Sequence, residues 1–519
     1  MKKSAVCLLL FLATVFMPTL LIGENARFKS PTFDVPYYRI VVDIALDQDQ
    51  NSIQEVQVDG RKWENFLVFQ DGKNIDLSKP LDKGQYTLEV DFAWIGGKEY
   101  QISVSHDSQK AHKTQKLEIR GKAPAKGGVP AQHEGFYRVY RAEELVGIER
   151  QEELCTIICT VPKKDFENQG FILMDGSSRI SCQILDVQES VPPEKIAASH
   201  PVTHTYKMVF PLAISPYGKK LLLLFKDEKK PEKPGFDILG ESWGKTIKNG
   251  SLELEFHPRS GQVNIIENTK LGIRIFNEAG VIHWNPGVHI PGIAWDHSFN
   301  WNPPPSYDET AGKYLYVNTR RGPLQKIKDV DLEIRYTMGS DWPYFISETL
   351  MTFKKSLCVS AVRNDEMVLY KELFDSLVYR NKAGKIIEMP LEEKREFPDG
   401  LVHVGPDDLG WVGLVKREKK YGFFSIRIDY ANAGLSTSGT WLNKPGTYFY
   451  APSSGKYVYW VRPLLYTWSE FTTRNLLTYV PEGSTFYEKN AYIILPLDQE
   501  FPRLLDRLLT KLKNPVRVY

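Results

Sequence analysis

The sequence has little of several features that mark specialised protein classes. It contains only 5 cysteines in 519 residues, which excludes a small disulfide-built scaffold. Lys and Arg number 66 against 64 Asp and Glu, so no excess of one charge indicates a nucleic acid or an anionic membrane surface as partner. There is no GxGxxG motif, no phosphate-binding P-loop and no HExxH motif, which disfavours the common nucleotide enzymes.

Long apolar runs are also missing, except at the N-terminus. Lys2 and Lys3 precede an apolar run over residues 5–22, which is the plan of a secretory signal peptide with cleavage after Gly23. An uncleaved membrane anchor is the alternative. No other stretch reaches the ~18 apolar residues that a second membrane span needs. The sequence therefore predicts a signal peptide over 1–23 and a secreted or periplasmic protein with no stable membrane span.

Four cysteines follow the predicted signal peptide: Cys155, Cys159, Cys182 and Cys358. Cys155 and Cys159 are four residues apart and share a face if that stretch is a strand. A disulfide between one of them and Cys182 is one interpretation, and buried free thiols are the other.

Alternation of apolar and polar residues, typical of strands with one buried face, dominates the chain. It is clearest over residues 38–46, 86–92, 252–256, 331–337 and 424–430. The dipeptide Asn249-Gly250 favours a hairpin with positive φ at both positions. Helical spacing is good only near the C-terminus, where Leu504, Leu505, Leu508, Leu509 and Leu512 form an apolar stripe preceded by Asp498 and Pro502. The sequence thus predicts an all-β protein with a short C-terminal helix.

Two linker-like segments divide the chain. They are KAPAKGGVP at 122–130 and DEKKPEKP at 227–234. We therefore expect an N-terminal β-sandwich domain over 24–122 and a small β-barrel-like domain over 133–228. A large antiparallel β-supersandwich over 236–497 and a helix over 498–514 complete the prediction.

One segment, 283–305, concentrates the residue types that contact sugars. Three of the ten histidines and three of the eleven tryptophans lie in it, and its Pro and Gly content predicts a long shaped loop. The candidate binding residues are His283, Trp284, Asn285, His289, Trp295, Asp296, Trp301, Asn302 and, further on, Tyr307; the candidate catalytic residues are His297, Tyr314, Arg320, Arg321 and Glu348.

Indole faces stack on the apolar faces of sugar rings, whereas Asn, Asp and His bind their hydroxyl groups. An arginine fork suits a carboxylate. The segment therefore predicts a subsite for an acidic sugar. Two other interpretations stay open. One is a loop packed by its own Trp and Pro residues, and the other is a metal site formed by the three histidines. We expect no cofactor, although a divalent metal remains an alternative.

The C-terminal half resembles the galactose-mutarotase-like β-supersandwich. The resemblance rests on residues 250–268, on the paired segments 330–338 and 342–353, and on 456–468. Residues 171–185 and 207–214 resemble the small barrel domains that precede such sandwiches in some exo-acting polysaccharide lyases. Those enzymes usually carry a helical toroid as well, for which this chain has no room. The resemblance implies a carbohydrate-facing concave sheet, in a family that includes epimerases, lyases, hydrolase domains and non-catalytic modules.

Three functions follow as hypotheses, all with a polysaccharide or oligosaccharide as partner and none with nucleic acid. The first is a lyase that eliminates at a uronate, with His297 as base, Tyr314 or Tyr307 as acid, and Arg320 or Arg321 neutralising the carboxylate. The second is a glycoside hydrolase or epimerase using Asp296 and Glu348 as the carboxylates, or Glu348 with a histidine for ring opening. The third is a non-catalytic glycan-binding or envelope protein.

Overall fold

The computed structural model describes most of the chain after the predicted signal peptide. The described residues are 27–29, 39–46, 49, 51–63, 66–71, 73–77, 79–91, 98–108, 113–122, 136–168, 170–175, 178–194, 200–228, 233–275, 286–391, 402–404, 410–433, 447–451, 456–466 and 477–519. The predicted signal peptide lies outside these residues. Within them, no helix combines the length and the apolar character that crossing a membrane would require.

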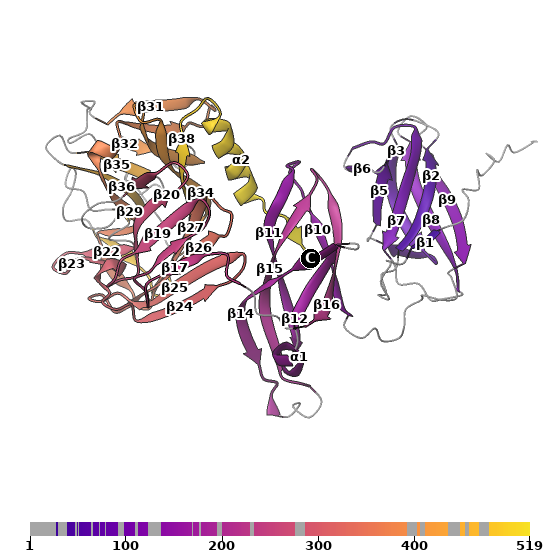
Figure 1. Ribbon diagram of the computed structural model, residues 1–519, viewed down its shortest axis with the longest axis horizontal. Helices are drawn as coiled ribbons and strands as arrows, with labels where there is room; N and C mark the ends of the chain where they lie inside the picture. The colour runs from indigo at the N-terminus through magenta and orange to yellow at the C-terminus, as the bar shows by residue number, and fades with distance from the viewer. Residues whose placement is uncertain are drawn as a thin grey trace, which may run out of the picture.

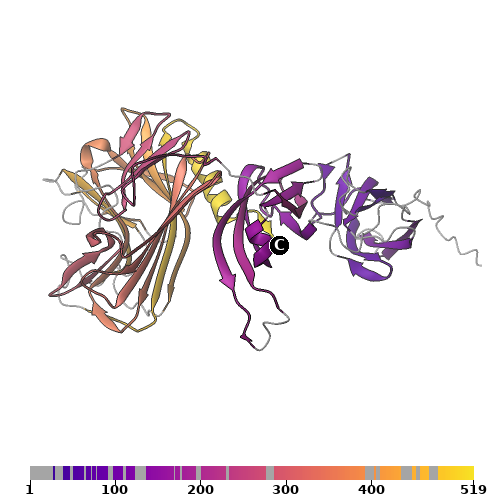
Figure 2. The same cartoon turned by 60° about the horizontal axis from the view of Figure 1, so that its bottom comes forward.

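The first of three bodies seen in a row in Figures 1 and 2 is built from two antiparallel sheets. Their apolar faces enclose one core, which includes Val42, Leu88 and Ile102. One sheet has the order β1 (Arg27–Lys29), β2 (Arg39–Leu46), β7 (Gly84–Asp91), β5 (Phe66–Gln70), β6 (Lys73–Asn74). The other has the order β4 (Arg61–Trp63), β3 (Asn51–Val58), β8 (Glu99–Ser108), β9 (Lys113–Lys122).

The second body has a separate core and includes the last residues of the chain. One sheet has the order β13 (Ser178–Ser181), β12 (Gly170–Asp175), β16 (Lys219–Asp227), β10 (Phe136–Glu143), β39 (Arg517–Val518). The other has the order β11 (Arg150–Pro162), β15 (Thr203–Ile214), β14 (Gln183–Ser190), and the short helix α1 (Lys163–Asn168) follows β11. Because β39 pairs with β10 and Val516 enters this core, the chain end belongs to the second body although the third precedes it in sequence.

The third body is the largest, and its main core lies between two broad sheets. A nine-stranded sheet has the order β24 (Ser306–Ala311), β25 (Leu315–Pro323), β26 (Val330–Gly339), β27 (Tyr344–Phe353), β38 (Thr485–Pro496), β34 (Tyr421–Ala433), β33 (Trp411–Lys416), β30 (Ser376–Arg380), β31 (Ile386–Pro390). A six-stranded sheet has the order β23 (Ala294–His297), β22 (Gly287–Ile290), β29 (Ala361–Tyr370), β36 (Tyr457–Tyr466), β35 (Thr447–Tyr450), β32 (Val402–Val404). Both sheets contribute to the same apolar core, which includes Tyr336, Phe423 and Trp460.

Smaller elements complete the third body. A five-stranded sheet has the order β17 (Asp237–Leu239), β18 (Thr246–Lys248), β19 (Leu252–Phe256), β20 (Val263–Asn268), β21 (Ile273–Ile275), and β28 (Leu357–Val359) pairs with β37 (Thr478–Val480). Two short 3₁₀ turns occur at Ser298–Asn300 and Lys371–Leu373. The helix α2 (Phe501–Lys513) covers a second apolar cluster on the nine-stranded sheet, which includes Phe424, Ile493 and Leu505.

The structure confirms the predicted all-β class and the short C-terminal helix. Each of the alternating segments is a strand, because alternate side chains enter a core while their neighbours face away. The helical stripe is mostly right, with Leu505 buried, but Leu504 is 47% exposed. The predicted domain limits themselves remain a prediction.

The predicted turn at Asn249-Gly250 forms the β18–β19 hairpin, but not through the expected backbone conformation. Neither residue has a positive φ. Instead, the Asn249 side chain accepts hydrogen bonds from the backbone N–H groups of Ser251 and Leu252 at 2.7 Å. Its amide group also donates to the Gly339 and Trp342 carbonyls, so Asn249 ties the hairpin to β26 as well as shaping the turn.

The four cysteines after the predicted signal peptide are thiols. Cys155, Cys159 and Cys182 are buried in the second body, and Cys358 is exposed. Cys155 and Cys159 share a face of β11 as predicted, and both enter the core of the second body. Burial raises the pKa of the Cys155 thiol to about 12.

Candidate functional site

Three predicted site residues and one neighbouring arginine meet on one face of the six-stranded sheet. We call His289, Trp295, His297 and Arg363 the Trp295 cluster. The indole of Trp295 lies parallel to the His297 imidazole, with ring centres 5.4 Å apart and an interplanar angle of 13°. The His289 ring is 5.1 Å away at 56°. The guanidinium carbon of Arg363 lies 4.1 Å from the centre of the Trp295 ring, a cation–π arrangement.

Strand alternation explains why these side chains share a face. In the β22–β23 hairpin, His289 pairs with Trp295 and Gly287 pairs with His297, so the hairpin holds His289, Trp295 and His297 on one side. Val288 and Asp296 occupy the alternate positions and are fully buried on the other side. The segment that the sequence predicts as one long loop is therefore partly a hairpin, followed by a 3₁₀ turn.

Gly287 provides the space in which the Trp295 cluster packs. It pairs with His297 on one side and with Arg363 on the other. A Cβ atom at Gly287 would overlap with Nδ1 of His297 and would lie 3.1 Å from the Asp296 carbonyl oxygen. The missing side chain at this position therefore allows the imidazole to lie across the strand, and Arg363 approaches from the far side.

Arg363 is the permanently charged member of the Trp295 cluster. The imidazole of His289 is half-buried and hydrogen-bonds to the Ser360 hydroxyl. Burial, and secondarily the charge on Arg363, hold the pKa of His289 below its ordinary value. A neutral imidazole and an indole around one guanidinium suit a ligand that is both ring-shaped and anionic.

Asp296 belongs to the same hairpin, but its buried side chain has a structural role. Its carboxylate is fully buried and accepts hydrogen bonds from the backbone N–H groups of Lys326, at 2.5 Å, and Ile327, at 2.8 Å. Asn300 Nδ2 donates to it from 2.9 Å. The side chain thus fixes the turn between β25 and β26 and is remote from solvent.

Trp301 and Arg320 lie inside the third body. The Trp301 indole is 2% exposed and donates to the Pro323 carbonyl at 2.8 Å. The guanidinium of Arg320 is fully buried between the rings of Trp301 and Tyr336, at 5.7 and 5.3 Å. It donates to the Ser260 carbonyl at 2.6 Å and to the Tyr336 hydroxyl at 3.2 Å. Burial lowers the pKa of Arg320, as expected for a cation taken out of water.

Tyr307 belongs to a hydrogen-bonded group around Glu309. The carboxylate of Glu309 accepts from Tyr307 at 2.5 Å and from Tyr316 at 3.0 Å, and it pairs with Lys245. Burial, followed by these neighbours, raises the pKa of Tyr307 far above its ordinary value. The hydroxyl of Tyr307 consequently keeps its proton and orients the Glu309 carboxylate.

The other candidate catalytic residues lie in three further environments. Tyr314 hydrogen-bonds to Ser181 and so joins the third body to the second. Arg321 bridges Asp308, at 2.6 Å, and Glu333, at 3.1 Å. The carboxylate of Glu348 on β27 accepts a hydrogen bond from the Tyr487 hydroxyl at 2.8 Å.

The structure thus brings together His289, Trp295 and His297, and joins them to a residue that was not among the candidates. Tyr307, Tyr314, Arg320, Arg321 and Glu348 instead contact Glu309, Ser181, Ser260, Asp308 and Tyr487, respectively. His283, Trp284 and Asn285 lie outside the described residues, and Asn302 is exposed. The described residues contain no group of three His, Cys, Asp or Glu side chains that could hold a metal ion, and a three-histidine site would need His283.

Sequence reasoning missed a buried polar group between the two broad sheets. The Glu488 carboxylate on β38 is 2% exposed and accepts a hydrogen bond from Asn364 Nδ2 at 2.9 Å. Arg427 lies 4.0 Å from the same carboxylate. One signal for this group is present in the sequence: Glu488 and Asn490 occupy the inward positions between Phe486 and Tyr492, where alternation would otherwise place apolar residues.

Comparison with known proteins finds likeness only among solved structures. No family model and no curated protein matches the chain. A glycosyl hydrolase family 38 protein from Enterococcus faecalis has 9% identity and a TM-score of 0.45, with 75% of this chain and 48% of that chain covered. This chain therefore spans about half the length of that protein.

Two further solved structures each resemble half of the chain. A galactose mutarotase-like protein from Lactobacillus casei has 10% identity and a TM-score of 0.32, covering 50% of this chain and 100% of its own. A putative aldose 1-epimerase from Escherichia coli K12 has 9% identity and a TM-score of 0.30, with 50% and 100% covered. Galactose mutarotase-like proteins, which the sequence patterns resemble, are thus among the similar structures. Such low identities and TM-scores leave the activity to be argued from the chain's own residues.

Proposed function

We propose that this is a secreted or periplasmic protein that binds an acidic carbohydrate on the Trp295 cluster. The observation that supports the proposal most directly is the Arg363 guanidinium held 4.1 Å above the Trp295 indole. Arg363 is 9% exposed and its Nε is sealed from solvent, so the carboxylate would be bound by two parallel hydrogen bonds from the terminal nitrogens of the planar guanidinium. The indole and the His289 ring supply apolar surface for the sugar ring.

Binding without catalysis is the form of this proposal that the geometry favours. A uronate lyase needs a base, an acid and a cation around one sugar. His297 lies in the Trp295 cluster, whereas Tyr314 contacts the second body and Arg320 is fully buried. A lyase would therefore have to use Arg363 as the neutralising cation, with His297 as base and an acid other than these residues.

A glycoside hydrolase or epimerase is a second candidate, and the buried Glu488 favours it. A carboxylate shielded from water beside an amide and an arginine is the kind of group that serves as a general acid or base. Asp296 and Glu348, the pair that the sequence predicts for this chemistry, lie in separate environments, because Asp296 accepts hydrogen bonds from backbone N–H groups and Glu348 belongs to the nine-stranded sheet.

The test is binding of polygalacturonate, alginate and heparin, with dextran as the uncharged comparison. We expect Arg363→Gln and Trp295→Ala each to weaken binding of the acidic glycans by about tenfold, the usual effect of removing one charged or aromatic contact. Arg274→Gln, an exposed arginine on β21 that pairs with Glu255 and Glu267, is the matched control and should bind normally. Equal binding by all three variants and the parent would overturn the proposal.

The same incubations separate binding from catalysis. An unsaturated product absorbing in the ultraviolet would identify a lyase, and shorter products without that absorbance a hydrolase. If hydrolysis occurs, Glu488→Gln should abolish it while leaving glycan binding in place. Binding with no product of either kind is what the arrangement of the Trp295 cluster predicts.

A further inference from the structure

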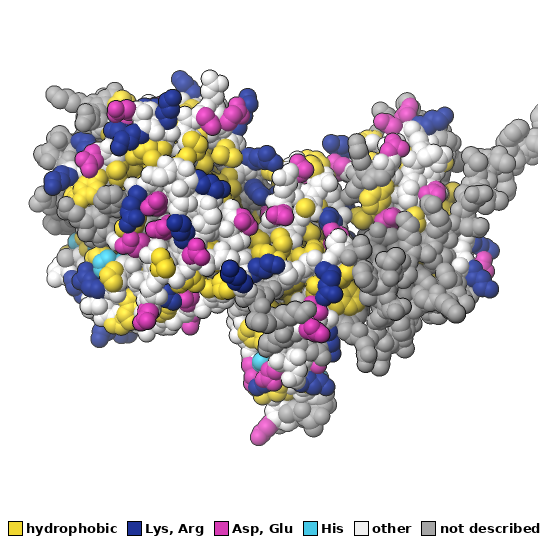
Figure 3. Space-filling model, in the orientation of Figure 1, with side chains coloured by type: hydrophobic (Ala, Val, Ile, Leu, Met, Phe, Trp, Pro, Cys, Tyr) yellow, Lys and Arg dark blue, Asp and Glu magenta, His cyan; other side chains and the backbone are white. Residues whose placement is uncertain are grey.

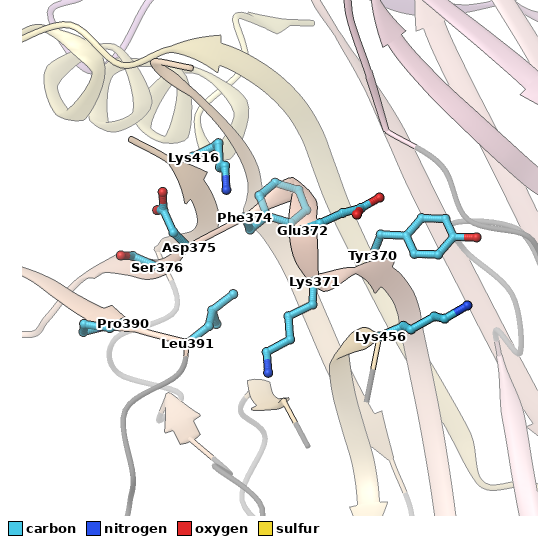
Figure 4. A pocket seen from close by; sticks show the side chains of 10 residues that line it. All are labelled: Tyr370, Lys371, Glu372, Phe374, Asp375, Ser376, Pro390, Leu391, Lys416 and Lys456. Carbon is cyan, nitrogen blue, oxygen red and sulfur yellow. The ribbon is translucent and has the colours of Figure 1, made fainter. Parts of the chain in front are cut away.

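A lysine-lined cavity opens at the end of the six-stranded sheet opposite the Trp295 cluster. Its volume is about 980 Å³, and Figure 4 shows the side chains that line it. The lining combines three lysines, Lys371, Lys416 and Lys456, with the carboxylates of Glu372 and Asp375. Figure 3 shows that basic and acidic side chains are interspersed over the face of the molecule that it displays.

Three ammonium groups against two carboxylates leave one positive charge in excess around the cavity. Asp375 accepts a hydrogen bond from the Arg417 backbone N–H at 3.0 Å, which directs one carboxylate oxygen to the start of the next turn. Figure 4 shows the Glu372 carboxylate pointing toward Tyr370, away from the ammonium groups of Lys371 and Lys416. Within the described residues, Lys416 and Lys456 take part in no ion pair.

The cavity also offers aromatic surface. Tyr370, at the end of β29, stacks on Tyr457 of β36 with ring centres 5.4 Å apart and an interplanar angle of 29°. Cationic groups beside stacked aromatic rings form the same kind of environment as Arg363 beside Trp295. Both therefore suit a ligand with ring faces and negative charges.

One side of the cavity, at Tyr370, lies on the same face of the six-stranded sheet as the Trp295 cluster, whereas Ser376, Pro390 and Lys416 come from the nine-stranded sheet. Leu369 and Val458 enter the main core, so the next positions, Tyr370 and Tyr457, point away from it. Arg363 is on that same outer face, because its guanidinium lies on the Trp295 ring. On the neighbouring strand β36, Pro463 pairs with Arg363 and Tyr457 pairs with Tyr370, so six residues of strand separate the two places, about 20 Å at roughly 3.3 Å per residue. A ligand that reaches both places must be an extended chain rather than a single sugar.

We propose that this cavity is a second anion-binding site, which holds acidic groups of the same carbohydrate chain that the Trp295 cluster binds. The inference rests on the proposed function for its ligand class and adds to it the requirement for an extended, repeatedly charged chain. Lys416 and Lys456 supply the cationic contacts, and Tyr370, which Tyr457 supports from outside the lining, supplies the sugar-facing surface.

Lysine acylation in the presence and absence of polygalacturonate tests the proposal on the intact protein. Peptide mass spectrometry then reports the modification of each lysine. We expect Lys416 and Lys456 to be protected, while the exposed Lys385 and Lys419, which lie outside the cavity, react as before. No protection at Lys416 and Lys456, or equal protection of all four lysines, would overturn the site.

Charge-matched double variants give the second readout. Lys416→Gln with Lys456→Gln should weaken polygalacturonate binding by roughly tenfold, because two partly exposed charge contacts are lost. Lys385→Gln with Lys419→Gln removes the same charge elsewhere and should change the affinity less than about twofold. The binding of galacturonic acid monomer, which cannot span both sites, should be unaffected by the cavity variant if it occupies the Trp295 cluster.

The two proposals fail in different ways. If Arg363→Gln binds polygalacturonate normally but the cavity variant does not, the Trp295 cluster is not a binding site and the cavity is. If only Arg363→Gln loses affinity, the proposed function stands and the second site is wrong.

Discussion

The guanidinium carbon of Arg363 lies 4.1 Å from the ring centre of Trp295, although 68 positions separate the two residues in the sequence. The contact exists because β29 pairs with β22, and β22 pairs with β23, which places Arg363, Gly287 and His297 in one row across the sheet. It joins a residue of the predicted sugar-binding segment to one that no local pattern connects with it. The chemistry of the Trp295 cluster therefore depends on strand pairing.

Gly287→Ala is expected to disrupt the Trp295 cluster. The new methyl group would overlap with the His297 ring, which has no room to retreat while it remains stacked on Trp295. We expect a loss of about 1–3 kcal/mol in the free energy of unfolding, as for other overpacked sites, together with weaker glycan binding. Denaturant unfolding and glycan affinity are the measurements. Gly250→Ala is the control, since a Cβ there meets nothing within 4 Å, and a change of similar size in both variants would contradict the explanation.

Arg150→Met should loosen the C-terminal helix. Arg150 is buried, pairs with Glu144 at 2.8 Å, and donates to the backbone carbonyls of Lys511 and Asn514. Its removal leaves the buried Glu144 carboxylate without its cation, which typically costs about 3–5 kcal/mol. Denaturant unfolding should show the loss, and limited proteolysis should cut the chain near α2 sooner.

The control for this variant is an ion pair on the same helix that is open to solvent. Arg503→Ala breaks the pair between Arg503 and Glu500, whose side chains are 82% and 67% exposed. We expect less than about 0.5 kcal/mol from that change. Equal destabilisation by the two variants would show that Arg150 does not anchor the helix.

The protonation of His289 should respond to Arg363. Burial and the Arg363 charge hold the pKa of His289 below the ordinary 6.5. The stability contributed by the neutral ring is therefore fully present above about pH 6.5, and it is lost as the pH falls below that value, because the unfolded chain binds the proton more readily. In Arg363→Gln the pKa of His289 should rise.

Histidine Cε1–H NMR of selectively labelled protein measures this shift, with His289→Gln identifying the resonance. His257 is an internal reference, because its pKa is also lowered by burial but its neighbouring cation is Arg259. The His257 titration should be the same in both proteins. An unchanged His289 titration in Arg363→Gln would show that Arg363 does not influence the imidazole.

The thiols should differ sharply in reactivity. Cys358 is exposed, whereas Cys155, Cys159 and Cys182 are buried and the pKa of Cys155 is raised to about 12. Because the thiolate is the reactive form, we expect iodoacetamide to label Cys358 in the folded protein and the other three only after unfolding. Mass spectrometry of the labelled peptides measures this, and Cys358→Ser should remove the fast reaction. Fast labelling of Cys155 in the folded protein would contradict the buried environment.

Much of the fold could be predicted from local patterns. Alternation at 252–256 and 331–337 marks β19 and β26, since one side of each strand enters the core, and the leucine stripe marks α2. The site was less accessible to such reasoning. The high density of Trp and His in residues 283–305 identifies His289, Trp295 and His297 as candidates. Composition alone, however, does not distinguish Trp295, on a sheet face, from Trp301, in the core.

The contacts of Arg320, Arg321 and Tyr314 also do not follow from their positions in the sequence. Arg320 and Arg321 are adjacent, and a sequence pattern treats them alike, yet strand geometry turns one between two aromatic rings and the other toward Asp308 and Glu333. Tyr314 was assigned to catalysis because it lies near these residues in sequence, whereas it contacts Ser181 in the second body. Nearness along the chain was a poor guide wherever neighbouring residues face opposite sides of a strand.

The sequence by itself determined the all-β class, the positions of the strands that alternate clearly, the C-terminal helix and the segment rich in Trp and His. These follow from the period of side-chain burial, which is a local property of the chain. The tertiary structure decided which strands pair, and with them that Arg363 lies on Trp295, that Arg320 is sealed in the core and that Glu488 is buried between two sheets. Those outcomes depend on register and on the loss of water around polar groups, which arise only when distant segments meet.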